Sequence, residues 1–395
     1  MVFRKLHVPV IGLIMFSDVT TAGGLNAQRG AEIGPLFSEK TFGIEVGTYQ
    51  IESKRKFTDV KGTNRSPSGP QAASGDASAH SNVSFSLPYY YVYANYGRSF
   101  GCMGRSYTPY YGEANPGSTW AGRHVQEKTK FDSDGLDVTC RVGFAVGTDG
   151  IFSVIGGWRK VDMELTTLSI SPAYTLGVEA EADTHLKTKN SGNGWRAGVA
   201  YELPKYQARA VLLYTSPVNV DLEGSTVYSA TKLTLADPKK LAVRTPRSLE
   251  LNLQSGLPIA GGLLGWINVR HEDWGQDWRQ LTSYSPITPP EITVLRWSDA
   301  LTVEMGAAKK LTPKLSMAST FSWDKGMAQD IRHSYGLSLG GNYALTDSLS
   351  VKLNVGARYS EGAKGVSKDL RSANVVDDVP GGWSYGYGAA VNLSF

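Results

Sequence analysis

The C-terminal segment from Trp383 to Phe395, WSYGYGAAVNLSF, decides the fold class of this chain. Its odd positions are apolar or aromatic, apart from one small Ala, whereas its even positions carry Ser, Gly, Ala and Asn. Alternation with a period of two places the two sets on opposite faces of a β-strand. Interfacial aromatics near one end and a terminal Phe at the other are typical of strands that cross a membrane in a β-barrel.

Three earlier segments repeat this alternation. Residues 349–360, 315–324 and 301–308 each carry apolar or small side chains on one face. In this register Glu304, Lys352 and Arg358 point inward, away from lipid. Alternation alone does not separate a barrel from a soluble sheet, because a soluble sheet also has one apolar and one polar face. The order of the connections is therefore needed.

Long and short connections alternate along the chain. The long connections are at 55–81, 111–123, 166–192, 217–246, 273–299, 325–333 and 361–382, and the tight turns at 94–97, 147–150, 202–205, 257–262, 311–314 and 345–348. An even number of strands, with short turns on one side and long polar loops on the other, is the rule for bacterial outer-membrane barrels. We therefore expect an all-β fold, a 14-stranded antiparallel transmembrane β-barrel with a short N-terminal plug segment.

Composition excludes several other classes. Charged residues make up 19% of the chain, below the roughly 25% usual in soluble domains, and 44 residues are Gly. No uncharged apolar run approaches the ~18 residues of a membrane-spanning helix, so a polytopic helical membrane protein is excluded. The net charge of +4 is too small to favour a nucleic-acid partner.

The N-terminus has the features of an export signal. Arg4 and Lys5 precede an apolar stretch at 6–16, and small residues follow at 20–22. We expect a signal peptide at 1–22, a short N-terminal hatch segment at 23–40 and the barrel at 41–395. The expected location is the bacterial outer membrane, where lipids contact the wall and Phe395 resembles the terminal aromatic that such barrels present to their assembly machinery.

Several segments resemble those of the FadL-type outer-membrane transporters of long-chain fatty acids and aromatic hydrocarbons. They are AGGLN at 22–26, PLF at 35–37 with GIEVG at 43–47, TPYYG at 108–112, TPRSLELN at 245–252 and VRHEDW at 269–274. The resemblance spans nearly the whole chain after the signal peptide. It implies that hydrophobic compounds enter from outside and leave sideways into the membrane through a gap made by a kinked third strand. It also implies a hatch inside the barrel, for which Leu25, Asn26 and Phe37 are the candidates.

The third strand carries residues that favour such a kink. Pro109 cannot donate a hydrogen bond to a strand ladder, and Gly112 lowers the local β-propensity. We expect the strand to bend away from a neighbour between Tyr107 and Gly112, and a lateral gate at Pro109 and Gly112. The alternative is that Pro109 only ends the strand near the outer rim.

Candidate substrate-binding residues lie on the inward register. If Leu263, Ile267 and Val269 face lipid, Leu264 and Trp266 face the lumen. A fatty-acid carboxylate would need a cation, and the inward arginines include Arg105 and Arg270, with Arg141, Arg196 and Arg358 as further candidates. The alternative is that these side chains only fill the barrel and that the arginines pair with inward carboxylates such as Glu250 or Glu304.

Other function classes have weaker support. The six His are scattered without metal-ligand spacing, so we expect no metal site, no cofactor and no catalytic site. The competing hypothesis is a general diffusion porin, or a structural or adhesive barrel. A porin would have a charged constriction and no N-terminal plug, whereas a transporter of hydrophobic compounds would have residues 25–37 threaded inside.

The two cysteines, Cys102 and Cys140, fall on the third and fourth strands. Symmetric antiparallel pairing across a loop centred near Ala121 would set them opposite each other on the lipid face. An exported chain meets an oxidising compartment, where such a pair can form a disulfide. A register slip of two residues would separate the sulfurs, and two free lipid-facing thiols are the preferred expectation.

Overall fold

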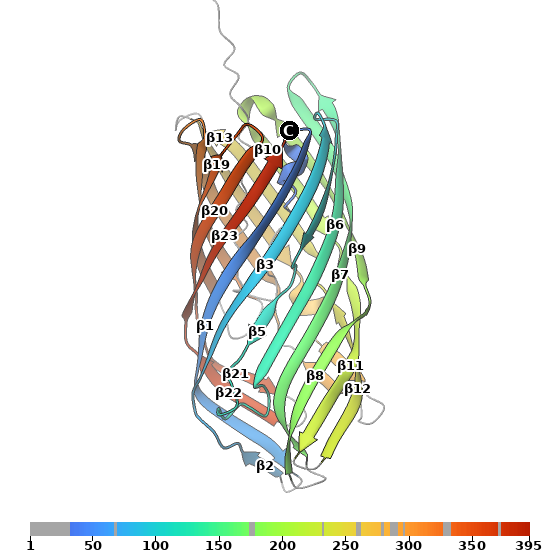
Figure 1. The fold of residues 1–395 in the computed structure, drawn as a ribbon, viewed down its shortest axis with the longest axis vertical. Coiled ribbons are helices and arrows are strands. Elements are labelled where there is room, and N and C mark those ends of the chain that lie inside the picture. The colour runs from blue at the N-terminus through green and yellow to red at the C-terminus, as the bar shows by residue number, and fades with distance from the viewer. Residues whose placement is uncertain are drawn as a thin grey trace, which may run out of the picture.

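The computed structural model describes residues 32–66, 69–173, 178–230, 233–257, 262–277, 280–284, 291–294, 297–326, 333–369 and 373–395. The strands form one closed, antiparallel, 14-stranded barrel (Figure 1). The predicted all-β, 14-stranded antiparallel barrel is therefore confirmed, while the N-terminal plug segment stays a prediction. The expected signal peptide at 1–22 lies outside the described residues.

Some barrel strands are continuous and others consist of two segments. The continuous strands are β1 (Phe42–Ser66), β3 (Ala79–Tyr96), β6 (Lys128–Val146), β7 (Gly150–Ala173), β18 (Leu315–Lys325) and β19 (His333–Ala344). The two-segment strands are β4 (Phe100–Tyr107) with β5 (Gly112–Ala114), β8 (Val178–Asn190) with β9 (Gly192–Leu203), β10 (Ala208–Thr215) with β11 (Asn219–Ala230), β12 (Leu233–Arg244) with β13 (Ser248–Leu257), β14 (Leu263–Glu272) with β15 (Gln280–Tyr284), β16 (Glu291–Val294) with β17 (Ala300–Lys310), β20 (Leu349–Ser360) with β21 (Ala363–Asp369), and β22 (Ala373–Val379) with β23 (Gly382–Ser394). The short β2 (Gly69–Ala72) pairs with β1.

Helical structure in the described residues is confined to three short segments, η1 (Gly34–Phe37), η2 (Pro204–Tyr206) and α1 (Trp274–Asp277). None of the described helices is long and apolar enough to cross a membrane.

The wall closes between the two ends of the chain. β1 pairs with β3 on one side and with β23 on the other, from Gly43↔Ser394 to Ser53↔Ser384. The C-terminal alternation acts as predicted, because Trp383, Tyr387 and Phe395 are all more than half exposed on the outer face. Glu304 and Arg358 are buried and Lys352 is half-buried, on the inner face, which confirms the predicted register.

The described tight turns gather at one end of the barrel together with the C-terminus and η1 (Figure 1). We call this the tight-turn end and the opposite one the long-hairpin end. Gly97 and Gly147 sit in two of these turns with φ values of 55° and 64°, which glycine adopts without a steric penalty.

Most of the expected long loops are largely ordered ladder instead. β11 and β12 pair from Asn219↔Arg244 to Ala230↔Leu233, inside the expected loop at 217–246. β7 and β8 likewise pair through most of 166–192, and β21 pairs with β22 within 361–382. The loop prediction was wrong there because polar, Gly-, Pro- or Ser-rich stretches were interpreted as loops, although alternate residues such as Val218, Val220 and Leu222 are apolar.

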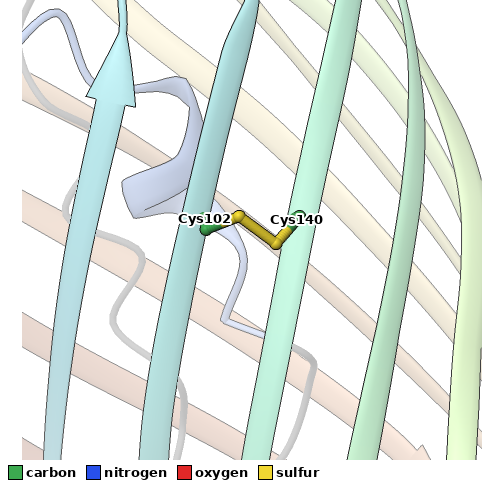
Figure 2. The surroundings of a disulfide bond; sticks show 2 residues. All are labelled: Cys102 and Cys140. Atoms are coloured by element: carbon green, nitrogen blue, oxygen red, sulfur yellow. A yellow bond between two sulfur atoms is a disulfide. The ribbon is translucent and has the colours of Figure 1, made fainter.

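Cys102 and Cys140 form a disulfide between β4 and β6 (Figure 2). They are direct ladder partners, and their Cα atoms are 4.0 Å apart. Phe100, Val138 and Val142 beside them are exposed, so the bond lies on the outer face as the register predicted. The preference for two free thiols was wrong, because β4 and β6 pair in the register that sets Cys102 directly opposite Cys140.

Candidate functional site

An apolar cluster occupies the lumen toward the long-hairpin end. Its central residue is Trp274 of α1, whose ring is fully buried and makes edge contacts with Tyr110 and Trp297, at centroid distances of 5.9 and 5.7 Å. The lumen of a water-filled barrel is polar. The lumen here instead holds a buried apolar cluster whose other members are Phe131, Val161, Met163, Leu186, Val218, Val220, Leu222, Leu241, Val243 and Ala300.

The wall is broken next to this cluster. The break lies in the third barrel strand, between its segments β4 and β5. The ladder between β3 and β4 ends at Tyr90↔Ser106, and the ladder between β4 and β6 ends at Tyr107↔Gly135. Pairing with β6 resumes at Gly112, in β5. Within the described strands, no ladder pair joins residues 79–89 of β3 to β4 or β5. The strand is thus broken where Pro109 and Gly112 predicted a bend, while their role as a lateral gate stays a prediction.

Two residues of β6 hold the broken segment against the inner wall. The Ser133 hydroxyl accepts a hydrogen bond from the Tyr110 N–H at 2.8 Å and donates one to the Tyr110 carbonyl at 2.7 Å. These bonds satisfy backbone groups that the interrupted ladder leaves unpaired. Gly135 provides the space, since a Cβ there would lie 3.0 Å from Pro109 Cδ. Sequence reasoning did not identify Ser133 or Gly135, because their partners are set by the break itself.

A charged network lies beside the break. Asp137 of β6 is 1% exposed and accepts hydrogen bonds from Arg196 at 2.9 Å and from the Tyr107 hydroxyl at 2.8 Å. The Nε atom of Arg159 is 3.8 Å from the same carboxylate, and Arg105 is its ladder partner. Arg159 and Arg196 thus both lie against the one buried carboxylate of Asp137.

The predicted binding residues all point inward, but the structure does not bring them together. Leu264 and Trp266 are buried, and Trp266 packs in a separate small cluster with Ala308 and Ala318. Arg105 is on the third strand and Arg270 on the ninth. Their roles in binding stay predictions.

Both arginines have an acidic residue as ladder partner, and their pairing with inward carboxylates stays the alternative interpretation. Arg270 is the ladder partner of Glu250, and Arg105 is the ladder partner of Asp137. Asn268 also donates a hydrogen bond to Glu304, at 3.5 Å. Glu250 and Glu304 therefore lie on the same side of the lumen as Arg270.

The described part of the hatch segment lies inside the tight-turn end. Leu36 is fully buried, and the Phe37 ring lies between Arg141 and Arg209, whose guanidinium carbons are 4.7 and 4.2 Å from its centroid. Asn95 also donates a hydrogen bond to the Pro35 carbonyl, at 3.0 Å. Phe37 thus packs against two arginines of the wall, whereas Leu25 and Asn26 lie outside the described residues, and the hatch role of all three stays a prediction.

A cavity of about 500 Å³ lies between this segment and a part of the wall that includes β1, β3, β19, β20 and β23. Its centre is polar, since buried Glu45 accepts hydrogen bonds from Lys352 and Tyr91, both at 2.6 Å. In the part of the chain that the structure describes, no group of three or more His, Cys, Asp or Glu is arranged to hold a metal ion.

The lumen cluster could have been found in part from the sequence. Val218, Val220 and Leu222 keep a period of two inside a segment read as loop, and Leu241 and Val243 do the same on the next strand. Trp274 gave no such signal, because it lies on a connection rather than on a strand.

Comparisons with known proteins agree with this geometry. No family model matches the chain. It is 27% identical over 191 residues to "Outer membrane protein P1" of Haemophilus influenzae, an alignment that covers 46% of this chain and 40% of that relative. The chain thus spans less than half the length of this curated relative.

Solved structures match over nearly the whole chain. A Pseudomonas aeruginosa FadL homologue superposes with a TM-score of 0.75 at 14% identity, over 95% of this chain and 96% of the other. The Ralstonia pickettii toluene transporter TbuX matches with a TM-score of 0.64 at 13% identity, over 96% and 98%. The P. putida toluene transporter TodX matches with a TM-score of 0.59 at 13% identity, over 95% of this chain and 96% of the other. The chain therefore has the FadL-type barrel fold, and the named relative together with the barrel's apolar outer face places it in the bacterial outer membrane.

Proposed function

We propose that this barrel carries hydrophobic compounds across the outer membrane, with long-chain fatty acids or similar molecules as substrates. The observation that carries the proposal is the apolar cluster inside the lumen, which reaches the broken third strand through Tyr110. Removing apolar surface from water is favourable by a free energy of about 25 cal/mol per Å². A chain of buried apolar side chains therefore offers such a compound a path that a polar pore does not.

The route runs from the long-hairpin end to the break in the wall. By the rule for outer-membrane barrels the tight turns face the periplasm, so the long hairpins face outward. Leu36 and Phe37 of the proposed hatch pack against the wall at the periplasmic end of the lumen. A substrate that reaches the cluster would leave sideways at Pro109 and Gly112 into the membrane, as the FadL-type resemblance implies.

The arginines beside the break favour substrates with a carboxylate. Arg159 and Arg196 flank the buried acid Asp137, and charges interact strongly in such a dry environment. A fatty-acid head group would pair with these arginines while its acyl chain contacts the lumen cluster. Relatives of this fold that are named as toluene transporters support the wider class of hydrophobic substrates.

Uptake by proteoliposomes tests this function. Reconstituted protein should accelerate the entry of a fluorescent long-chain fatty acid without sustaining a steady ion current in a planar bilayer. Leu222→Asn, within the lumen cluster, should slow uptake several-fold. Val211→Thr changes an equally buried inward residue near the hatch and is the matched control. A porin-like conductance without fatty-acid uptake would favour the diffusion-porin alternative.

A further inference from the structure

The unpaired edge of β3 is covered by an aromatic pair. Phe85 of β3 and Tyr111 of the broken segment stack with their centroids 4.1 Å apart and their planes 22° apart. They are only 7% and 4% exposed, although the backbone ladder is missing between their segments. Side chains therefore close a part of the wall that hydrogen-bonded strands close elsewhere.

The pair belongs to a small apolar cluster of its own. Ile51 of β1 and Leu87 of β3 complete this cluster, and both are almost fully buried. One hydrogen bond also crosses here, from the Asn115 N–H to the Ser81 hydroxyl at 2.8 Å. A ring contact is non-directional and is exchanged readily for contact with another apolar group, whereas separating paired strands breaks directional hydrogen bonds.

Tyr111 is held at its hydroxyl and through the backbone of the residue before it, and the Nζ atom of Lys130 lies 5.6 Å from its ring centroid. Ser133 fixes the preceding residue through both backbone groups of Tyr110. The Tyr111 hydroxyl donates a hydrogen bond to Glu113 at 2.6 Å. The segment thus presents the ring at a defined place, where its contact with Phe85 is a ring stack.

The same short segment links the lumen cluster to the stack. Tyr110 contacts Trp274 in the lumen, and the next residue, Tyr111, contacts Phe85 at the unpaired edge. A compound that displaces the Tyr110 contact therefore lies one residue from the pair that closes the wall.

We propose that Phe85 and Tyr111 form a side-chain gate across the broken third strand, and that Ser133 is the positioning residue that sets the gate's place. This inference rests on the proposed sideways exit. An apolar chain inserts between the two rings, which replaces ring–ring contact by ring–chain contact, and the stack re-forms behind it. The rest of the wall does not need to separate.

Truncating either ring should open the gate. In proteoliposomes, Phe85→Ala and Tyr111→Ala should each raise the rate of fatty-acid uptake at least threefold. Phe57→Ala removes an equally buried inward ring that packs on Trp120, in a part of β1 that pairs with β3, and should leave the rate within twofold. Gel mobility of the unheated protein reports whether each variant is folded.

Closing the gate covalently gives the opposite effect. In a Phe85→Cys/Tyr111→Cys variant, a short thiol-specific bifunctional reagent should reduce uptake to the level of protein-free vesicles. The native cysteines are joined to each other and do not react. Full uptake by the cross-linked protein would overturn the gate and leave the transport function standing, whereas absence of uptake by the wild type would refute the transport function and the gate with it.

A second measurement does not require transport. Leu87→Cys places a single free thiol behind the stack, where Leu87 is fully buried. A lipid-soluble maleimide should label this thiol slowly. Adding Phe85→Ala should raise the labelling rate at least tenfold, whereas adding Phe57→Ala should leave it unchanged. Equal labelling rates in all three proteins would overturn the gate.

Discussion

Two seams of the barrel wall show how the same kind of strand gives a closed wall or an opening. The seam between β1 and β23 joins the two ends of the chain by an unshifted ladder from Gly43↔Ser394 to Ser53↔Ser384. The seam between β3 and β4 ends after Tyr90↔Ser106, although β3 continues back to Ala79. On its other side the same part of β3 pairs fully with β1.

The difference shows that the break belongs to the third barrel strand, β4 with β5. It does not belong to β3, which is the second barrel strand. Pro109 removes a ladder donor, Ser133 satisfies the backbone of Tyr110, and Gly135 makes room for the proline ring. The disulfide ties β4 to β6 shortly before the break. The strand therefore stays attached to β6 while it parts from β3.

The largest effect is expected from a charge on the outer face of the closed seam. Val391 is 51% exposed, in the apolar part of β23. Val391→Arg should lower the free energy of unfolding by about 2–4 kcal/mol, because an arginine facing the bilayer core is poorly solvated. Urea unfolding in lipid vesicles measures this change in the free energy of unfolding, and the inward substitution Asn354→Gln is the control. A loss below about 0.5 kcal/mol would mean that this face does not contact the membrane core.

Removing the disulfide beside the break should have a similar or smaller effect. Cys102→Ser/Cys140→Ser opens a link between residues 38 apart in sequence, and such links contribute typically about 2–4 kcal/mol. The same unfolding assay measures this loss of stability. Adding reductant to the wild type opens the bond independently of the substitutions. Two labelled thiols per unfolded, unreduced wild-type chain would show that the bond does not form.

Loss of the Ser133 hydroxyl should destabilise the broken seam. Ser133→Val leaves the N–H and carbonyl of Tyr110 buried without partners, at a cost of about 1–3 kcal/mol. Ser133→Thr keeps the hydroxyl and should recover most of this loss. If the threonine variant is as unstable as the valine variant, the hydroxyl does not hold the segment.

The smallest stability change and a specific functional one are expected at Pro109. Pro109→Val restores a backbone donor, so pairing at the break should extend and fatty-acid uptake should fall several-fold. The free energy of unfolding should change by less than about 1 kcal/mol, because a proline at a compatible position contributes about 0.4–1 kcal/mol through the unfolded chain. Pro204→Val in the η2 turn removes a proline far from the break and should leave uptake unchanged. Unchanged uptake by a folded Pro109→Val barrel would remove the break from the route.

Local patterns in the sequence predicted the wall better than its contents. Alternation fixed the inward register of Glu304, Lys352 and Arg358, and turn residues placed the tight turns, because both signals depend on neighbouring positions. The stack of Phe85 on Tyr111 joins residues from two strands that are not paired there, so no periodicity reports it. Charged residues hid the hairpin at 217–246, since a strand that leaves the membrane can expose charge on one face and still pair.

Photolabelling with a fatty acid that carries a diazirine on its acyl chain tests the central claim most directly. The proposed route predicts that peptides containing the lumen cluster, such as Val220 and Trp274, and the segment 108–112 carry most of the adducts in folded, reconstituted protein. Excess unlabelled fatty acid should suppress these adducts. Adducts concentrated instead around Glu45 and Lys352, in the polar cavity beside the hatch, would contradict a sideways exit through the third strand.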